Sequence, residues 1–239
     1  MQVCNTGQAG RRIMSMQPNI DFTLSTAPQV YEWLRDAILR GELPPGSRLS
    51  ETEIANQVGV SRQPVREAFI RLTSDGLAEV RPQRGTYIRR ISVSAVLSAR
   101  LIREAVESDL IRMLAEQADD RLLARLDQEI EEQSVAVARN DAETFVRLDD
   151  RFHRLLAVAA GQEAVWEVLE GLKSQMNRLR YITARTFDIQ KLIGQHAEIV
   201  EGLRNHDPAL AEQAMRRHLR ELLNDLPEIS RSRPELFIP

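Results

Sequence analysis

Apolar residues in the first part of the chain repeat with the period of short helices. Residues 28–40 carry an apolar side chain at every fourth position and predict a first helix, which Gly41 ends. These apolar positions are Val30, Leu34 and Ile38. A turn at 42–46 and a very short strand at 48–49 are expected to follow.

Two capped helices come next. Ser50 and Glu53 have the spacing of a capping box and predict a second helix, which Gly59 ends. Ser61 can cap a third helix, which Gly76 ends. The apolar residues of the third helix recur at helical spacing: Val65, Ala68, Phe69 and Leu72. The short turn between the two helices is typical of a helix-turn-helix.

A hairpin is expected after the third helix. Two β-like runs, 77–80 and 86–91, are joined by the turn-rich segment 81–85. Three helices followed by a small hairpin predict a winged helix-turn-helix over residues 28–91, preceded by a flexible tail over 1–27.

From residue 92 onward the pattern is helical, with no convincing strand. Helices are expected over 94–118, 120–139, 142–160, 163–185, 188–205 and 208–225. The short breaks between them favour an all-α antiparallel bundle of about six helices over 92–230, with a C-terminal tail at 231–239. The fold class is therefore mainly α.

Composition excludes several classes of protein. Hydrophobic residues make up 43% and charged residues 28%, as in soluble globular proteins, and no apolar run is long enough to span a bilayer. The first 18 residues lack the apolar core of a secretory signal, and Cys4 is the only cysteine. A cytoplasmic protein without a membrane partner is expected.

Charge is distributed unevenly along the chain. Residues 28–91 contain 10 arginines, no lysine and 8 acidic residues, whereas residues 92–239 contain 20 basic and 26 acidic residues. Arginine suits planar recognition of phosphates and base edges, which favours DNA binding by the N-terminal part.

The start of the third helix carries the residues that best fit DNA contacts. In a helix-turn-helix this end enters the major groove. Arg62 and Arg66 lie four residues apart, on a face away from the apolar one, and can pair with guanine or phosphate, while Gln63 can pair with adenine. Arg84 in the hairpin loop can reach the minor groove. The alternative is an ordinary solvated face.

A second candidate site lies in the helical part. Asp149 and His153 are spaced i, i+4 and share one helix face. His196 and His218 each lie 11 residues from Asp207, the turn of the last predicted hairpin, so they are expected at the same height. Three imidazoles and a carboxylate suit a divalent ion, zinc or nickel. The alternative is that these are satisfied core or surface histidines.

The N-terminal segments resemble those of a known family. Residues 43–51, 60–68 and 84–86, together with Leu72 and Gly76-Leu77, are similar to the DNA-binding domain of GntR-family transcriptional regulators. The resemblance implies recognition-helix contacts by Arg62 and Arg66 and a wing contact by Arg84 and Gly85. One departure is Thr52, where many relatives have arginine, so a phosphate contact there would be weaker.

The C-terminal part resembles the FCD ligand-binding domain of the FadR-type branch. The matching segments are 103–107, 149–153, 160–161, 196–199 and 215–219. The resemblance implies a divalent metal held by four residues: Asp149, His153, His196 and His218. It also implies a small organic-acid effector paired with Arg103, although Arg103 can equally form an i, i+4 ion pair with Glu107.

These expectations describe a homodimeric regulator, not an enzyme. It would bind a pseudo-palindromic operator, repress transcription, and lose operator affinity when the acid binds near the metal. Two alternatives stay open. One is a metal-dependent enzyme with an accessory DNA-binding domain, and the other is a DNA-bound protein with a purely structural metal.

Overall fold

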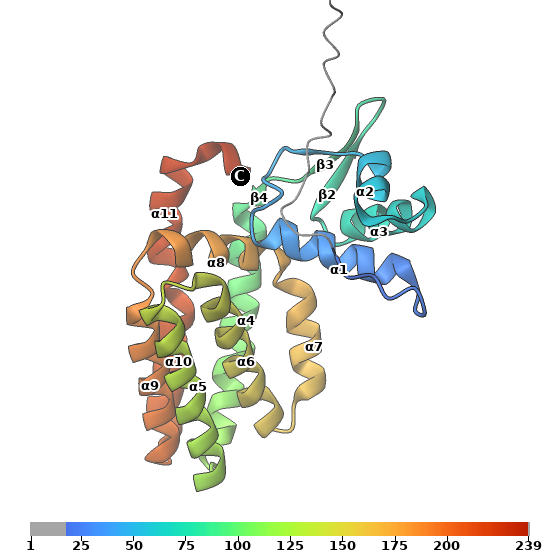
Figure 1. Cartoon of the computed structure of the whole chain (residues 1–239). Helices are drawn as coiled ribbons and strands as arrows, with labels where there is room; N and C mark the ends of the chain where they lie inside the picture. Colours follow the sequence, from blue (N-terminus) through green and yellow to red (C-terminus); the bar gives the residue numbers. More distant parts are fainter. Residues whose placement is uncertain (1–17, 239) are drawn as a thin grey trace, which may run out of the picture. The chain divides into compact units, whose positions relative to one another are not determined.

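The computed structural model describes residues 18–238, which form two compact units (Figure 1). The first takes in residues 18–38 and Glu42–Ile88, and the second takes in Leu39–Gly41 and the residues from Arg89 onward. Cys4 and most of the expected N-terminal tail lie outside the described residues. Residues 18–25 precede the first helix without regular structure.

The first unit is a winged helix-turn-helix. Its helices are α1 (Thr26–Leu39), α2 (Glu51–Val58) and α3 (Arg62–Ser74). Strands β1 (Arg48–Leu49), β2 (Ala78–Arg81) and β3 (Gly85–Ile88) form an antiparallel sheet in the order β1-β3-β2. The predicted short strand and hairpin are both confirmed, and β2 and β3 form the wing.

Local chemistry sets the turn between α2 and α3. The Ser50 side chain accepts a hydrogen bond from the backbone N–H of Glu53, as the capping-box spacing predicts. Gly59 ends α2 in the left-handed conformation, with φ of 78°, which only glycine adopts freely. Ser61 occupies the N-cap position of α3, although its side chain makes no capping bond.

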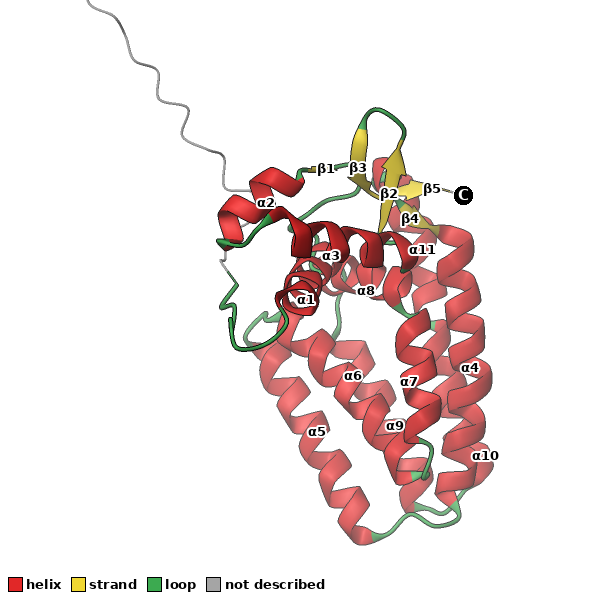
Figure 2. Ribbon diagram, turned by 90° about the vertical axis from the view of Figure 1, so that its right-hand side faces the viewer, coloured by secondary structure: helices red, strands yellow, loops and turns green. Residues whose placement is uncertain are grey.

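The second unit is a helical bundle (Figure 2). Its long helices are α4 (Val93–Ala115), α5 (Asp120–Ala138), α6 (Ala142–Ala159), α9 (Gln190–Arg204) and α10 (Pro208–Arg220). Helix α10 packs against both α4 and α9, and α5 packs against α6 and α9. Their apolar faces form one buried core, which includes Phe152, Ile199 and Met215.

The predicted helix over 163–185 is wrong in one respect, because two helices occupy this stretch. Helix α7 (Glu163–Leu172) ends at Lys173, and α8 (Ser174–Thr186) then crosses one end of the bundle. Lys173 is buried at the junction, where its ammonium lies 3.1 Å from Asp150 and 4.1 Å from the ring centre of Trp166. The contact with Asp150, which belongs to α6, gives no signal in the helical period of this stretch.

The C-terminal expectations also need correction. The helix predicted over 208–225 ends at Arg220, and α11 (Leu222–Ser232) follows. Beyond it lie a 3₁₀ turn (Pro234–Leu236) and β5 (Phe237–Ile238), which pairs in parallel with β4 (Ile91–Ser92). The expected tail is therefore ordered up to residue 238. A two-residue strand is too short to show alternation, so the sequence pattern could not predict this pair.

The hairpin of α9 and α10 is closely packed. Asp207 caps α10 by accepting hydrogen bonds from the backbone N–H groups of Ala209 and Leu210, and Pro208 occupies the first turn. A Cβ atom on Gly202 would lie 2.6 Å from the backbone of Ala211, so glycine permits this approach. The close approach fixes which residues of the two helices face each other.

Candidate metal centre and DNA-binding surface

The structure brings together the four residues that the sequence predicted as metal ligands. Asp149 and His153 come from α6, His196 from α9 and His218 from α10, and all four are buried. One ligand atom from each lies within 4.8 Å of those of the others. We call these residues the Asp/His group.

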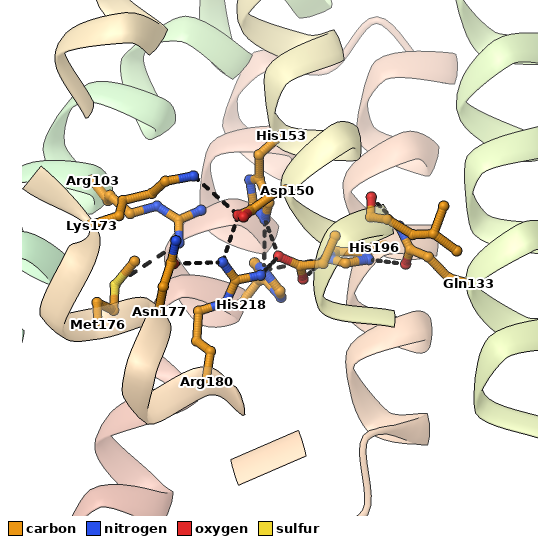
Figure 3. Close-up of polar contacts among 12 residues, drawn as sticks. Arg103, Gln133, Asp150, His153, Lys173, Met176, Asn177, Arg180, His196 and His218 are labelled. Carbon is orange, nitrogen blue, oxygen red and sulfur yellow. Dashed lines mark hydrogen bonds and ion pairs between the residues drawn. The ribbon is translucent and has the colours of Figure 1, made fainter. Parts of the chain in front are cut away.

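The Nε2 atoms of the three histidines converge (Figure 3). His218 Nε2 lies 3.1 Å from His153 Nε2 and 3.3 Å from His196 Nε2. Asp149 Oδ1 is 3.4 Å from His196 Nε2, and Asp149 Oδ2 is 3.9 Å from His153 Nε2. A tetrahedral ion with bonds of about 2.0–2.1 Å has ligand atoms roughly 3.3 Å apart. The spacing therefore fits a zinc-sized ion.

Each imidazole also has an oxygen atom beside its other nitrogen. His196 Nδ1 lies 2.7 Å from Gln133 Oε1, His218 Nδ1 lies 3.2 Å from Gln195 Oε1, and His153 Nδ1 lies 2.6 Å from Glu107 Oε2. An oxygen acceptor keeps the ring proton on Nδ1, so the lone pair of Nε2 points toward the other histidines.

Three converging lone pairs favour a cation between them. With the protons on Nδ1, the short Nε2–Nε2 contacts join two acceptors and hold no hydrogen bond. Burial lowers the pKa of His196 to about 3 and holds the pKa of His218 well below its usual value, so both rings stay neutral. Neutral imidazole is the form that binds metals. The donor set therefore fits a divalent ion.

Asp149 and its neighbour Asp150 share one arginine. Arg180 of α8 donates from Nη2 to Asp149 Oδ2 and from Nη1 to Asp150 Oδ1, the latter at 2.6 Å. Burial alone would raise the pKa of Asp149, but Arg180 keeps it below the ordinary value. Asp150 also forms an ion pair with Lys173, so both carboxylates are paired with cationic side chains.

A cavity opens beside the Asp/His group. It encloses about 520 Å³ of empty space, part of it open to solvent. Asp149, His218 and Arg180 line it together with Met176 and Thr183.

Arg103 forms the ion pair with Glu107 that was one of the two alternatives, and its pairing with an effector stays a prediction. It lines the cavity, and it also forms the i, i+4 ion pair with Glu107, with Arg103 Nε 2.5 Å from Glu107 Oε1. Both side chains are buried. Glu107 thereby links Arg103 to His153.

The predicted DNA-contact residues lie on the surface of the first unit. Arg62, Gln63 and Arg66 are exposed on α3, while Val65 and Leu72 are buried on its other face. Arg62 lies 3.0 Å from Glu51, and Gln63 donates to Glu67. Thr52 on α2 is exposed as well.

The wing presents Arg84 at its tip. Arg84 is exposed, and its backbone N–H donates to Arg81 in the turn between β2 and β3. Gly85 has φ of 106°, and a Cβ atom there would lie 3.3 Å from Arg48 Nε. A side chain at this position would therefore press against the Arg48 side chain of β1.

Two family models match the chain. Residues 26–88 match "Bacterial regulatory proteins, gntR family", and residues 99–221 match the "FCD domain". The HTH-type transcriptional repressor RspR of Escherichia coli is 35% identical over 228 residues, 94% of this chain and 99% of that protein. The chain belongs to the GntR family of transcriptional regulators, with an FCD domain.

Further relatives agree with this assignment. The "Probable D-xylose utilization operon transcriptional repressor" of Paenarthrobacter nicotinovorans is 29% identical and covers 82% of this chain and 86% of that protein. A crystal structure of a GntR-type regulator from Rhodococcus is 25% identical, with a TM-score of 0.73 over 85% of this chain and 99% of that one. McbR/YncC of E. coli, 21% identical with a TM-score of 0.73, has the same fold over 86% of this chain and 98% of that one.

GntR regulators with an FCD domain are DNA-binding regulators and not enzymes, which removes the enzyme alternative. In the part of the chain that the structure describes, no helix is long and apolar enough to cross a bilayer.

Sequence reasoning missed the residues around the Asp/His group. Gln133 gave the clearest signal, because it interrupts the apolar positions of its helix at Leu126, Ile130 and Val137. A polar residue in such a stripe is buried, and its side chain needs a partner. Glu107 and Arg180 gave no comparable signal.

Proposed function

We propose that this regulator holds a divalent ion, zinc or nickel, in the Asp/His group. The observation that carries the proposal is the convergence of three Nε2 atoms whose Nδ1 atoms each face an oxygen. Asp149, His153, His196 and His218 would bind the ion, which would supply a Lewis-acidic centre for an incoming oxygen ligand.

A small organic acid is the effector that suits this site. The cavity beside the group is lined by Arg103 and Arg180, and both a metal ion and a guanidinium favour a carboxylate. The acid would lower the affinity of the protein for its operator, because effector and DNA binding are coupled through the protein.

The DNA-binding unit would act as one half of a homodimer. Arg62, Gln63 and Arg66 would contact the major groove, Arg84 and Gly85 the minor groove, and Thr52 a phosphate, on each half of a pseudo-palindromic operator. Repression is the outcome we propose, since two relatives bear the word repressor in their names.

Metal content by elemental mass spectrometry is the direct test. We expect about one divalent ion per chain, and loss of the ion in a variant that combines His153→Ala and His196→Ala. The exposed His206 provides the control, because His206→Ala should keep the ion. No metal above background after loading with zinc or nickel would refute the proposal.

The operator response separates a sensor from a protein with a purely structural metal. The metal-loaded protein would be titrated with organic acids while it is bound to a labelled operator duplex. Release of the duplex by an acid supports the sensor. Tight metal binding without any response to acids would favour the structural ion.

A further inference from the structure

The exposed face of α3 carries a carboxylate among the predicted DNA contacts. Arg62, Gln63 and Arg66 lie on this face, and Glu67 is exposed as well, about one helical turn after Gln63. The phosphates of a DNA duplex repel a carboxylate on the surface that approaches them. A favourable effect of Glu67 on DNA binding must therefore come from a source other than its charge.

The side chain of Glu67 has Gln63 as its only polar partner among residues 18–238. Gln63 Nε2 donates to Glu67 Oε1 over 2.9 Å. Glu51 is paired with Arg62, whereas Glu67 forms no ion pair within the described residues. Because a carboxylate offers only acceptors, the amide of Gln63 must turn its NH₂ group toward Glu67. The contact therefore fixes the orientation of an amide that could otherwise face either way.

The amide of Gln63 keeps one donor and one acceptor for DNA. Glu67 occupies one of its two N–H groups, and Gln63 Oε1 accepts no hydrogen bond within the described residues. In the major groove, adenine presents the acceptor N7 beside the donor N6 amino group, so both remaining groups of Gln63 find a partner there. This pairing uses the N–H on the same side as Oε1 and leaves the other N–H for Glu67.

The same contact disfavours guanine. A free glutamine amide can donate both of its N–H groups to guanine, whose N7 and O6 are acceptors. With one N–H held by Glu67, only one donor is left, and Gln63 Oε1 finds no donor on the guanine edge. Cytosine and thymine each offer one polar group and can form one bond with the amide. The pair of Gln63 and Glu67 therefore matches only adenine with two bonds.

We propose that Glu67 is a positioning residue for base recognition, which restricts Gln63 to adenine in the operator. This inference rests on the proposed major-groove contact of Gln63 and deepens it, because it names the residue that discriminates between adenine and guanine. Glu67 itself would make no contact with the DNA. An ordinary i, i+4 contact that only stabilises α3 would have no effect on base preference.

Fluorescence anisotropy with matched duplexes tests the inference. A duplex obtained by in vitro selection provides the operator, and the position at which Gln63→Ala loses its base preference is the one that Gln63 contacts. Two duplexes that differ there in both half-sites, A·T in one and G·C in the other, would be titrated with full-length wild type, Glu67→Ala, Glu67→Gln and Glu53→Ala. Glu53 is the matched control, because it is an exposed glutamate of α2 and its replacement changes the charge equally.

The ratio of the two affinities is the quantity that the inference predicts. We expect wild type to prefer the A·T duplex by about tenfold, as a two-bond contact does, and Glu67→Ala to reduce this ratio to less than about threefold. The ratio should fall because Glu67→Ala binds the G·C duplex more tightly. Glu67→Gln keeps an acceptor and should retain a larger part of the preference. Glu53→Ala should change both affinities alike and leave the ratio unchanged.

The outcomes separate this inference from the proposed DNA contact. A wild-type ratio in Glu67→Ala, or an equal loss in Glu53→Ala, would overturn the role of Glu67. In a variant that already carries Gln63→Ala, Glu67→Ala should not change the ratio further, and a further loss would overturn the inference by showing that Glu67 reads the base itself. Base preference that survives Gln63→Ala at every position would remove the Gln63 contact and this inference with it, while Arg62 and Arg66 are tested by their own variants.

Discussion

Gly202 of α9 lies directly against the backbone of Ala211 in α10, and this contact sets the register that places His196 opposite His218. We expect Gly202→Ala to lower stability by about 1–3 kcal/mol, because the added methyl group forces the helices apart. Metal affinity should fall as well. Thermal unfolding and competition with a chromophoric chelator would measure the two effects.

The same helix offers a matched control. A Cβ atom on Gly194 would meet nothing within 4 Å, and the residue is exposed. Gly194→Ala should therefore be neutral or stabilise the protein by up to about 1 kcal/mol through helix propensity. Equal destabilisation by both substitutions would show that close packing at Gly202 is not the cause.

Gln133 should tune the metal site without binding the ion. Its Oε1 accepts from His196 Nδ1, and Leu would replace it in an apolar helix face with little change in volume. We expect Gln133→Leu to weaken zinc binding about 10–100-fold, the usual effect of losing such a partner. Gln133→Glu keeps an acceptor and should retain the affinity. The exposed Gln128→Leu is the control, and an equal loss there would contradict the role of Gln133.

The buried histidines predict a pH dependence of stability in metal-free protein. The folded-state pKa of His196, about 3, lies below its unfolded value, and that of His218 is also lowered. The two neutral histidines therefore make their full contribution to the free energy of unfolding above a pH of about 6.5. This contribution is lost as the pH falls toward the folded-state pKa. The carboxylates with a lowered pKa lose their contribution to stability only below about pH 4.5. Between about pH 4.5 and 6.5 the histidines therefore dominate the pH dependence of stability.

Melting temperatures of chelator-treated protein at pH 7.5, 6.5 and 5.5 would measure this effect. The free energy of unfolding should fall with pH by up to about 1.4 kcal/mol per pH unit for each histidine. A variant with His196→Gln and His218→Gln should respond less to pH, whereas His206→Gln should keep the full slope. A melting temperature that is the same at pH 7.5 and 5.5 would rule the effect out.

The exposed arginines of α3 should carry operator affinity. We expect Arg62→Ala and Arg66→Ala each to cost about 1–3 kcal/mol of binding free energy, as lost base or phosphate contacts do. Fluorescence anisotropy with a duplex obtained by in vitro selection would measure the loss. Arg125→Ala, an exposed arginine on α5, is the control. Wild-type affinity in both α3 variants would exclude this face as the DNA contact.

Periodicity predicted the helices that bury one face, and motif spacing predicted the Asp/His group. Equal distances of His196 and His218 from Asp207 were enough to place them together, because a helical hairpin preserves distance from its turn. The break at Lys173 could not be predicted, since nothing in the local pattern shows that this lysine is buried beside Asp150 of α6.

Residues whose roles depend on tertiary neighbours were the ones that the sequence could not assign. Arg180 lies 31 residues from Asp149 along the chain, and nothing in its local pattern distinguishes it from the exposed Arg185. Glu107 was foreseen as a partner of Arg103 but not of His153, because that contact joins two helices.

The parallel pair of β4 and β5 makes the C-terminus an unsuitable place for a label. Phe237 is buried beside Ile91, which follows the DNA-binding unit by only a few residues. The pairing of β5 with β4 therefore holds the start of the second unit in place. A fusion partner or affinity tag placed there would disturb the pairing of β5 with β4. Loss of Phe237 and Ile238 would remove this pairing and loosen the start of the second unit, although neither residue belongs to the Asp/His group or to the α3 surface.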